Sequence, residues 1–259
     1  MNSSTTKWNS KLYNDKHAFV YDYGEQLIAL LNPKKHERIL DLGCGSGQLT
    51  FKINALAKEA VGIDKSPEMI ADAKMKFKNV AFHVGDAEDF SFDDKFDSIF
   101  SNATLHWIKN QKKAIKCMSE NLVDGGKLVL EFGGKGNIQT IITQLRLELA
   151  ERGYLEQSNL DVWYFPTIGE YCTALESSDF RVVSAEHYDR PTELADENTG
   201  IKDWLSMFAA RFFENIAIRD VENIKTKVQE NVKETCLIHG NWYADYKRIR
   251  VVAVKENLS

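Results

Sequence analysis

The sequence has no long hydrophobic run. No segment approaches the roughly 20 apolar residues that a membrane-spanning helix needs. The N-terminal stretch MNSSTTKWNSKLYNDK has no apolar core, so it does not resemble a signal peptide. The chain also lacks C-x-x-C pairs, because its four cysteines are widely separated, at Cys44, Cys117, Cys172 and Cys236. Scattered cysteines of this kind favour a reducing compartment, and we predict a cytoplasmic protein with no membrane segment.

Charge of one sign is not concentrated anywhere. The chain has 33 Lys and Arg against 38 Asp and Glu, a net charge of −5, and no basic block that favours nucleic acid. Its six histidines show no metal-ligand spacing, so no metal site is predicted. With 259 residues, 43% of them hydrophobic, the chain can form one large domain around a sizeable core. The expected partner is a small-molecule substrate, and the sequence does not predict an oligomeric state.

The most informative stretch is Arg38–Gln48, RILDLGCGSGQ. An apolar run typical of a strand breaks into three alternate glycines, at Gly43, Gly45 and Gly47, and a helical pattern then begins. Such a turn lets a ligand approach the backbone and presents free amide groups at a helix N-terminus. A dinucleotide-binding turn needs a third small residue at position 48, where this chain has Gln48. A turn that binds nothing is the remaining alternative.

The segment Asp41–Gly47, DLGCGSG, resembles the first motif of the class I S-adenosylmethionine (SAM) dependent methyltransferases. The resemblance implies an α/β fold: a Rossmann-like, doubly wound, mainly parallel seven-stranded sheet with an antiparallel last strand. It also implies SAM as cofactor and S-adenosylhomocysteine as product. We expect a single domain with an N-terminal helical lid (1–32), an α/β core (33–189), a helical insertion (190–240) and a last strand (241–259).

Two acids follow the next two predicted strands. Asp64 ends the run AVGID and lies 21 residues after Gly43, where a carboxylate accepts from the ribose hydroxyls of an adenosine. Both NAD and SAM carry that ribose. A helix N-cap is the alternative role, but Ser66 before Pro67 fits it better. Asp86 follows the third strand, and the resemblance implies that it accepts from the adenine amino group.

The motif and the strand ends together give the set of residues that we predict to bind the cofactor. They are Tyr13, Asp41, Gly43, Cys44, Gly45, Gly47, Gln48, Asp64, Lys65, Met69, Asp86, Ala87, Glu88 and Asn102.

The fourth predicted strand, Phe96–Phe100, runs into Ser101–Trp107, SNATLHW. This stretch resembles the fourth motif of small-molecule methyltransferases, those of the trans-aconitate methyltransferase group in particular. An amine or hydroxyl acceptor benefits from a general base, and His106 is the predicted catalytic residue for that role. A carboxylate acceptor is ionised at pH 7 and needs no base. The alternative for His106 is a packed loop in which backbone groups satisfy the imidazole.

Aromatic residues are dense between Trp8 and Tyr23, and this stretch is either a lid over the ligand or a helix pair packed on the sheet. Glu131, near the end of the fifth strand, either lies behind the acceptor pocket or is a solvated strand end. Arg190 is a candidate carboxylate clamp, with a surface arginine as the alternative. The predicted substrate-binding residues are Trp8, Tyr21, Trp107, Trp163 and Arg190.

The sequence thus predicts a SAM-dependent methyltransferase that acts on a small molecule, with a carboxylate oxygen as the favoured acceptor. Amine, hydroxyl and carbon acceptors stay open. Two other classes also remain, a SAM-binding protein without catalysis and a nicotinamide oxidoreductase.

Overall fold

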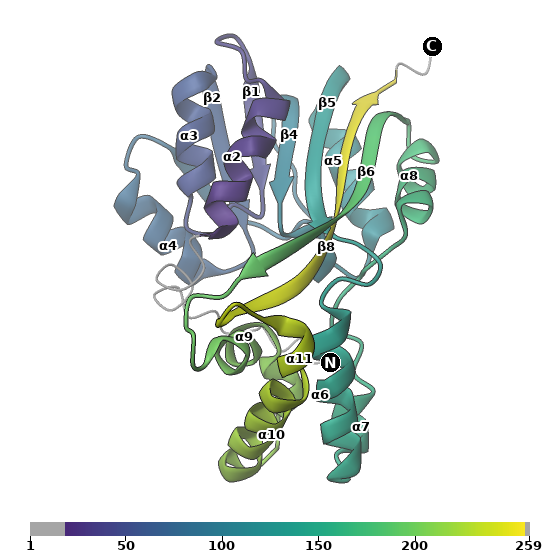
Figure 1. Ribbon diagram of the computed structural model, residues 1–259. Coiled ribbons are helices and arrows are strands. Elements are labelled where there is room, and N and C mark those ends of the chain that lie inside the picture. Colours follow the sequence, from purple (N-terminus) through teal and green to yellow (C-terminus); the bar gives the residue numbers. More distant parts are fainter. Residues whose placement is uncertain (1–18, 257–259) are drawn as a thin grey trace. The chain divides into compact units, whose positions relative to one another are not determined.

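The computed structural model describes residues 19–256, with side chains from Gly24 onward (Figure 1). The described chain divides into two compact units, which are treated separately. The larger unit contains residues 19–135, 163–188 and 248–256, and the smaller unit contains 136–162 and 189–247. Strands β6 and β8 contribute residues to both units.

The larger unit is built on a mainly parallel sheet. Its strands are β1 (Arg38–Leu42), β2 (Glu59–Asp64), β3 (Ala81–Val84), β4 (Phe96–Asn102), β5 (Leu122–Gly133), β6 (Phe180–Glu193) and β8 (Asn241–Lys255). Their order in the sheet is β3-β2-β1-β4-β5-β8-β6. Strands β1 to β5 pair in parallel, and β8 pairs with β5 in antiparallel fashion. The mainly parallel sheet with an antiparallel last strand is confirmed, and the short strand β7 (Leu237–Ile238), which pairs with β8, adds an eighth strand to the seven predicted.

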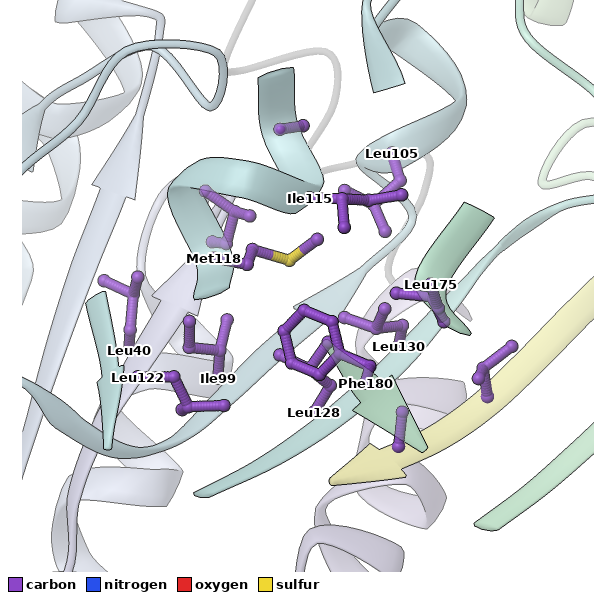
Figure 2. Close-up of a cluster of buried hydrophobic side chains, with 14 of the residues drawn as sticks. Leu40, Ile99, Leu105, Ile115, Met118, Leu122, Leu128, Leu130, Leu175 and Phe180 are labelled. Atoms are coloured by element: carbon purple, nitrogen blue, oxygen red, sulfur yellow. The ribbon is translucent and has the colours of Figure 1, made fainter. Parts of the chain in front are cut away.

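Alternating apolar side chains cover both faces of this sheet. On one face, α2 (Phe19–Leu31) and α3 (Gln48–Leu56) pack against Ile39, Phe100 and Val129. On the other face, α5 (Gln111–Asn121) and α8 (Ile168–Glu176) pack against the residues between those, such as Leu40, Ile99 and Leu128 (Figure 2). Period-two alternation therefore sends successive residues of one strand into two different cores.

Local signals in the sequence set the helix ends. Helix α4 (Pro67–Lys76) begins after Ser66, whose side chain accepts from the amide of Met69, with Pro67 in the first turn. This confirms the predicted cap and leaves Asp64 available for another role. Helix α8 starts with a capping box formed by Thr167 and Glu170. A short 3₁₀ turn, η1 (Leu105–Trp107), links β4 to α5.

The smaller unit is mostly helical. It contains α6 (Gln139–Glu151), α7 (Leu155–Ser158), α9 (Gly200–Phe208), η2 (Ala210–Phe213), α10 (Ile218–Asn231), α11 (Lys233–Cys236) and the short strand β7 (Leu237–Ile238), which pairs with β8. The helices α9 to α11 lie between β6 and the last strand, as predicted. Inside the unit, the indole of Trp204 donates to the hydroxyl of Tyr246 at 2.7 Å.

Strand β6 is long and passes through Pro191 to end at Glu193. Arg190 and Thr192 are buried and their neighbours are exposed, so the residues around Pro191 keep the period-two alternation of a strand. Arg190 is therefore not the surface arginine of the alternative interpretation.

Within residues 19–256, no helix has the length and apolar character required to cross a membrane.

Candidate active site

The glycine turn after β1 is fastened to β2 by its own backbone. The amides of Gly43 and Cys44 both donate to the carbonyl of Ile63, at 2.8 and 2.9 Å. The amide of Gly45 donates to Oδ2 of Asp64 at 3.0 Å, and that of Gly47 donates back to the carbonyl of Cys44. The expectation of free amides is therefore wrong for these four groups, because they bond within the protein. These hydrogen bonds fix the position of the turn relative to the end of β2.

The three glycines serve different purposes, although all have positive φ. A Cβ on Gly43 would lie 2.1 Å from Oγ1 of Thr104, and one on Gly47 would lie 2.6 Å from the ring of Phe82. A Cβ on Gly45 would have no neighbouring atom within 4 Å. Gly43 and Gly47 therefore allow close packing inside the protein, whereas Gly45 leaves the outer side of the turn open to a ligand.

Asp41 lies buried beneath this turn. Its Oδ2 accepts from the hydroxyl of Thr50, in α3, at 2.6 Å. Burial raises the pKa of Asp41 to about 7, the Thr50 hydrogen bond opposes that rise, and the charge of Asp64 adds to it. The adjacent Cys44 thiol is also buried, and burial raises its pKa. The base of the turn thus holds an acid that readily exchanges its proton near neutral pH.

Asp64 stands at the carboxyl end of β2. Its two oxygens accept from backbone amides, Oδ2 from Gly45 and Oδ1 from Ser66 at 2.9 Å. Burial raises the pKa of Asp64, and these backbone hydrogen bonds limit the rise. Within residues 19–256, neither Asp64 nor Asp41 forms an ion pair. A carboxylate such as Asp64, which no protein cation in this range neutralises, can accept hydrogen bonds from a ligand.

Asp86 follows β3 and is more exposed. The ammonium group of Lys65 donates to its Oδ2 at 2.8 Å, and the amide of Glu88 donates to its Oδ1 at 3.0 Å. Burial alone would raise the pKa of Asp86, but the bonds from Lys65 and Glu88 bring it below its ordinary value. The Glu88 side chain accepts from the amide of Asn110 at 3.3 Å. The structure therefore joins the loops after β2 and β3 through a salt bridge.

The end of β4 is a strained turn. Asn102, the last residue of the strand, is buried, and Ala103 has φ of 57°. The Ala103 amide donates to the carbonyl of Glu131 at 2.8 Å, and the Thr104 hydroxyl donates to the carbonyl of Gly43 at 3.2 Å. A positive φ at a non-glycine residue costs free energy and often marks a functional site. The turn after β4 is thereby held against both the glycine turn and β5.

His106 sits in an aromatic cluster formed by His106, Trp107, Trp163 and Phe165. Its Nδ1 accepts from the amide of Gly133 at 3.3 Å, and its carbonyl accepts from the amide of Tyr164 at 2.8 Å. The rings of Trp163 and Phe165 stack at 5.9 Å, and Trp107 lies 5.7 Å from Trp163. Two segments far apart in sequence thus bring the predicted residues His106, Trp107 and Trp163 together, and Phe165 joins them.

The other predicted residues are placed as follows. The side chain of Met69 is buried at the start of α4, Ala87 lies in the loop after β3, and Oε1 of Gln48 accepts from the hydroxyl of Ser46 at 2.9 Å. Arg190 is buried in the smaller unit, whereas the residues above belong to the larger one. Trp8 and Tyr13, and the side chain of Tyr21, lie outside the described residues.

The sequence left two positions open for Glu131, behind the acceptor pocket or at a solvated strand end. It is 1% exposed, so the alternative of a solvated strand end is wrong. Its Oε2 accepts from Tyr188 and from Arg250, two residues that the sequence pattern did not single out. No local signal identifies them, because their meeting with Glu131 depends on the pairing of β5 with β8 and on the neighbouring β6.

These groups gather where the sheet order reverses. Strand β1 lies between β2 and β4, and the connections that leave β1 and β4 diverge from their carboxyl ends. In open α/β sheets the ligand crevice lies at that point. The glycine turn, Asp64, Asp86 and the Asn102 turn all stand there, and within the described part of the chain no cluster of histidine, cysteine or acidic residues could hold a metal ion. The fold and site define an adenosine-binding α/β protein.

Comparison with known proteins gives the family. A family model described as a methyltransferase domain matches residues 33–162. An uncharacterized methyltransferase of Schizosaccharomyces pombe, C70.08c, is 32% identical over 96% of this chain and 98% of its own length. A trans-aconitate 2-methyltransferase of Methylobacterium nodulans is 33% identical, but the match covers only 37% of this chain and 38% of the relative.

A solved structure agrees in fold. The S-adenosylmethionine dependent methyltransferase of Mesorhizobium loti superimposes with a TM-score of 0.54 over 89% of this chain and 96% of its own, at 17% identity. The chain belongs to the methyltransferase domain family, and it is a class I SAM-dependent methyltransferase. The site fits SAM, because Gly45 leaves the outer side of the turn open next to the Asp64 carboxylate, a suitable acceptor for ribose hydroxyls.

Proposed function

We propose that this methyltransferase methylates a carboxylate oxygen of a small organic acid, of the trans-aconitate type. The observation that carries the proposal is the hydrogen bond from the Gly133 amide to Nδ1 of His106. A neutral imidazole that accepts at Nδ1 carries its proton on Nε2. In this state it does not serve as a base through Nε2.

A carboxylate acceptor does not need a base. Its oxygen is already ionised at neutral pH and attacks without losing a proton. Bound SAM supplies a methyl group that is already activated by the positive charge of the sulfonium. The protein therefore needs to orient the acceptor and exclude water, and such positioning supplies roughly 7–11 kcal/mol of a barrier. Amine and hydroxyl acceptors would require a base that this arrangement of His106 does not provide.

The aromatic cluster supports the exclusion of water from the acceptor. We propose that Trp107 and Trp163 form an apolar wall against the carbon chain of the acceptor, with Phe165 stacked behind Trp163. Arg190 remains a proposed clamp for a carboxylate, and Asp64, Asp86, Lys65 and Asn102 remain the proposed contacts of the adenosine and methionine parts of SAM.

The name of one relative also supports a carboxylic acid as the acceptor. The trans-aconitate 2-methyltransferase matched above carries the name of a carboxylic acid substrate. We also propose that the protein works in a reducing compartment such as the cytosol, since Cys44, Cys117, Cys172 and Cys236 are all free thiols.

The test is methyl transfer from labelled SAM to a pool of small carboxylic acids, followed by mild base. A methyl ester releases its label as volatile methanol, so base-labile product supports the proposal. Binding of SAM is measured in parallel by calorimetry. If SAM binds and no acid accepts the methyl group, the proposal is wrong, and pools of amines, hydroxyl compounds and carbon acids come next.

A further inference from the structure

Side chains from three neighbouring strands converge on one oxygen of a buried carboxylate. Glu131 lies on β5, Arg250 opposite it on β8, and Tyr188 on β6. The Tyr188 hydroxyl donates to Oε2 of Glu131 at 2.7 Å, and Nε and Nη2 of Arg250 lie 2.8 and 2.7 Å from the same oxygen. Nη2 of Arg250 also donates to the Tyr188 oxygen at 2.9 Å. The guanidinium is therefore held along one edge.

This cluster is a costly way to stabilise a fold. Glu131 is 1% exposed, and removing a carboxylate and a guanidinium from water offsets most of their mutual attraction. Burial lowers the pKa of Arg250, but Glu131, Tyr188 and Glu186 raise it by more, so the guanidinium stays charged. A buried pair of this kind is weak evidence for stability and better evidence for a role in recognition.

The Arg250 side chain is partly exposed. The Arg250 side chain is 21% exposed, against 1% for Glu131. Among residues 19–256, no group accepts from Nη1 of Arg250. A guanidinium already immobilised by two partners loses little further freedom when it binds an anion, and its planar N–H groups match a carboxylate.

The strand register places Arg250 in line with the end of β4. Asn102 is paired with Glu131, and Glu131 with Arg250, so the three side chains stand in one row on one face of the sheet. Asn102 ends β4, next to the turn that packs on Gly43. Two strand spacings separate Asn102 from Arg250, which amounts to about 10 Å. An acceptor whose methylated carboxylate lies near the end of β4 would therefore reach Arg250 only with a second carboxylate at the far end of a short carbon chain.

We propose that Arg250, held by Glu131 and Tyr188, binds a second carboxylate of the acceptor and selects di- and tricarboxylic acids over monocarboxylic acids. This rests on the proposed function, since it assumes that the acceptor is an acid. Glu186, exposed on β6, opposes the binding through its own negative charge. Replacing Glu186 should therefore strengthen the binding of an acid, whereas replacing Arg250 should weaken it.

The experiment titrates two acids into protein saturated with S-adenosylhomocysteine, by calorimetry. The probes are trans-aconitate, with three carboxylates, and crotonate, with one. For Arg250→Lys we expect about tenfold or more weaker trans-aconitate binding, because lysine loses the planar pair of donors. Crotonate binding should not change, and Glu186→Gln should bind trans-aconitate severalfold more tightly.

Arg38→Lys is the matched control. Arg38 also pairs with a glutamate, Glu59, at 2.7 Å, but at the amino end of β1, and its replacement should leave both acids unaffected. Affinity for S-adenosylhomocysteine and the melting temperature show whether each variant is folded. If Arg250→Lys does not fold, Tyr188→Phe replaces it, since it keeps the charge and frees the guanidinium, and it should weaken trans-aconitate binding alone.

The outcomes separate this proposal from the function on which it rests. If trans-aconitate is methylated and the Arg250 variant binds and methylates it as the wild type does, the role of Arg250 is wrong and the carboxylate function stands. If the acid binds through Arg250 but never receives a methyl group, the function is wrong and the binding site stands. If the wild-type protein binds neither acid, both proposals are overturned.

Discussion

The backbone amide of Gly45 donates to the carboxylate of Asp64 at 3.0 Å, and this bond joins the glycine turn to the end of the neighbouring strand. Gly45 is also the glycine of this turn at which an added Cβ would meet no other atom within 4 Å. The acid proposed to hold the ribose and the backbone that a ligand approaches are therefore fixed to each other. They form one preorganised surface rather than two independent contacts.

Asp64→Ala should weaken SAM binding by about 10- to 100-fold, because each hydrogen bond to a charged group contributes roughly 1.5–3 kcal/mol. Calorimetric titration with SAM measures the change, and circular dichroism verifies the fold. Asp93→Ala is the control, since Asp93 is an exposed acid in the loop before β4. Unchanged affinity in the Asp64 variant would show that the ribose is held elsewhere.

Without ligand, stability should fall as pH rises, through Asp41. Its pKa is about 7 in the folded protein, against the ordinary value of 3.8 that applies to the unfolded chain, so the folded protein binds the extra proton between those values. The free energy of unfolding then decreases with pH in that window, by about 2 kcal/mol between pH 5.5 and 8. The protection is complete below the unfolded pKa and is lost as pH rises through 7.

Asp41→Asn tests this, because asparagine keeps an acceptor for the Thr50 hydroxyl but does not titrate. Denaturant melts at both pH values give the free energies of unfolding. The variant should lose the wild-type difference of about 2 kcal/mol, whereas Asp93→Asn should keep it. An equal pH dependence in wild type and Asp41→Asn would mean that Asp41 is ionised throughout.

Gly43→Ala should destabilise the protein far more than Gly125→Ala. Both glycines have positive φ, 79° and 75°, but a Cβ on Gly43 would lie 2.1 Å from Thr104, and one on Gly125 would meet nothing within 4 Å. The Gly125 variant should lose only the roughly 1–2 kcal/mol of stability that a left-handed backbone conformation costs a residue with a Cβ. Overpacking adds about 1–3 kcal/mol or more for Gly43.

Thermal unfolding of the two variants gives the comparison. The double variant Gly43→Ala with Thr104→Gly removes the clashing side chain and should recover part of the lost stability. Equal losses at Gly43 and Gly125 would contradict the close packing of Thr104 on the turn.

His106→Asn should lower the rate of methyl transfer to a carboxylate less than tenfold. The asparagine oxygen can still accept from the Gly133 amide in place of Nδ1, and no base is lost. Removal of a general base typically costs 10²- to 10⁴-fold. Steady-state rates on the acid identified in the pool provide the test, and a loss of that larger size would restore His106 as the base.

Most of the fold, and the strand-end residues of the site, could be predicted from the sequence. The glycine turn, Asp64 and Asp86 are strand-end features, and a strand end can be recognised from an apolar run and the residue that follows it. The serine cap at Ser66 and the helices before the last strand are equally local. Element ends are harder to predict, because they depend on burial: β6 passes through Pro191 to Glu193, with Arg190 and Thr192 buried.

What the sequence determined by itself is the order of strands and helices, the class of ligand turn and the acids at the strand ends, because these depend on residues close together in the chain. The tertiary structure decided which amides of the turn are already bonded and which nitrogen of His106 accepts. It also brought Phe165 to His106 and Trp163 to Trp107, and Arg250 and Tyr188 to Glu131. Tyr188 and Arg250 lie 57 and 119 positions from Glu131 in the chain, and only the pairing of strands brings them to it.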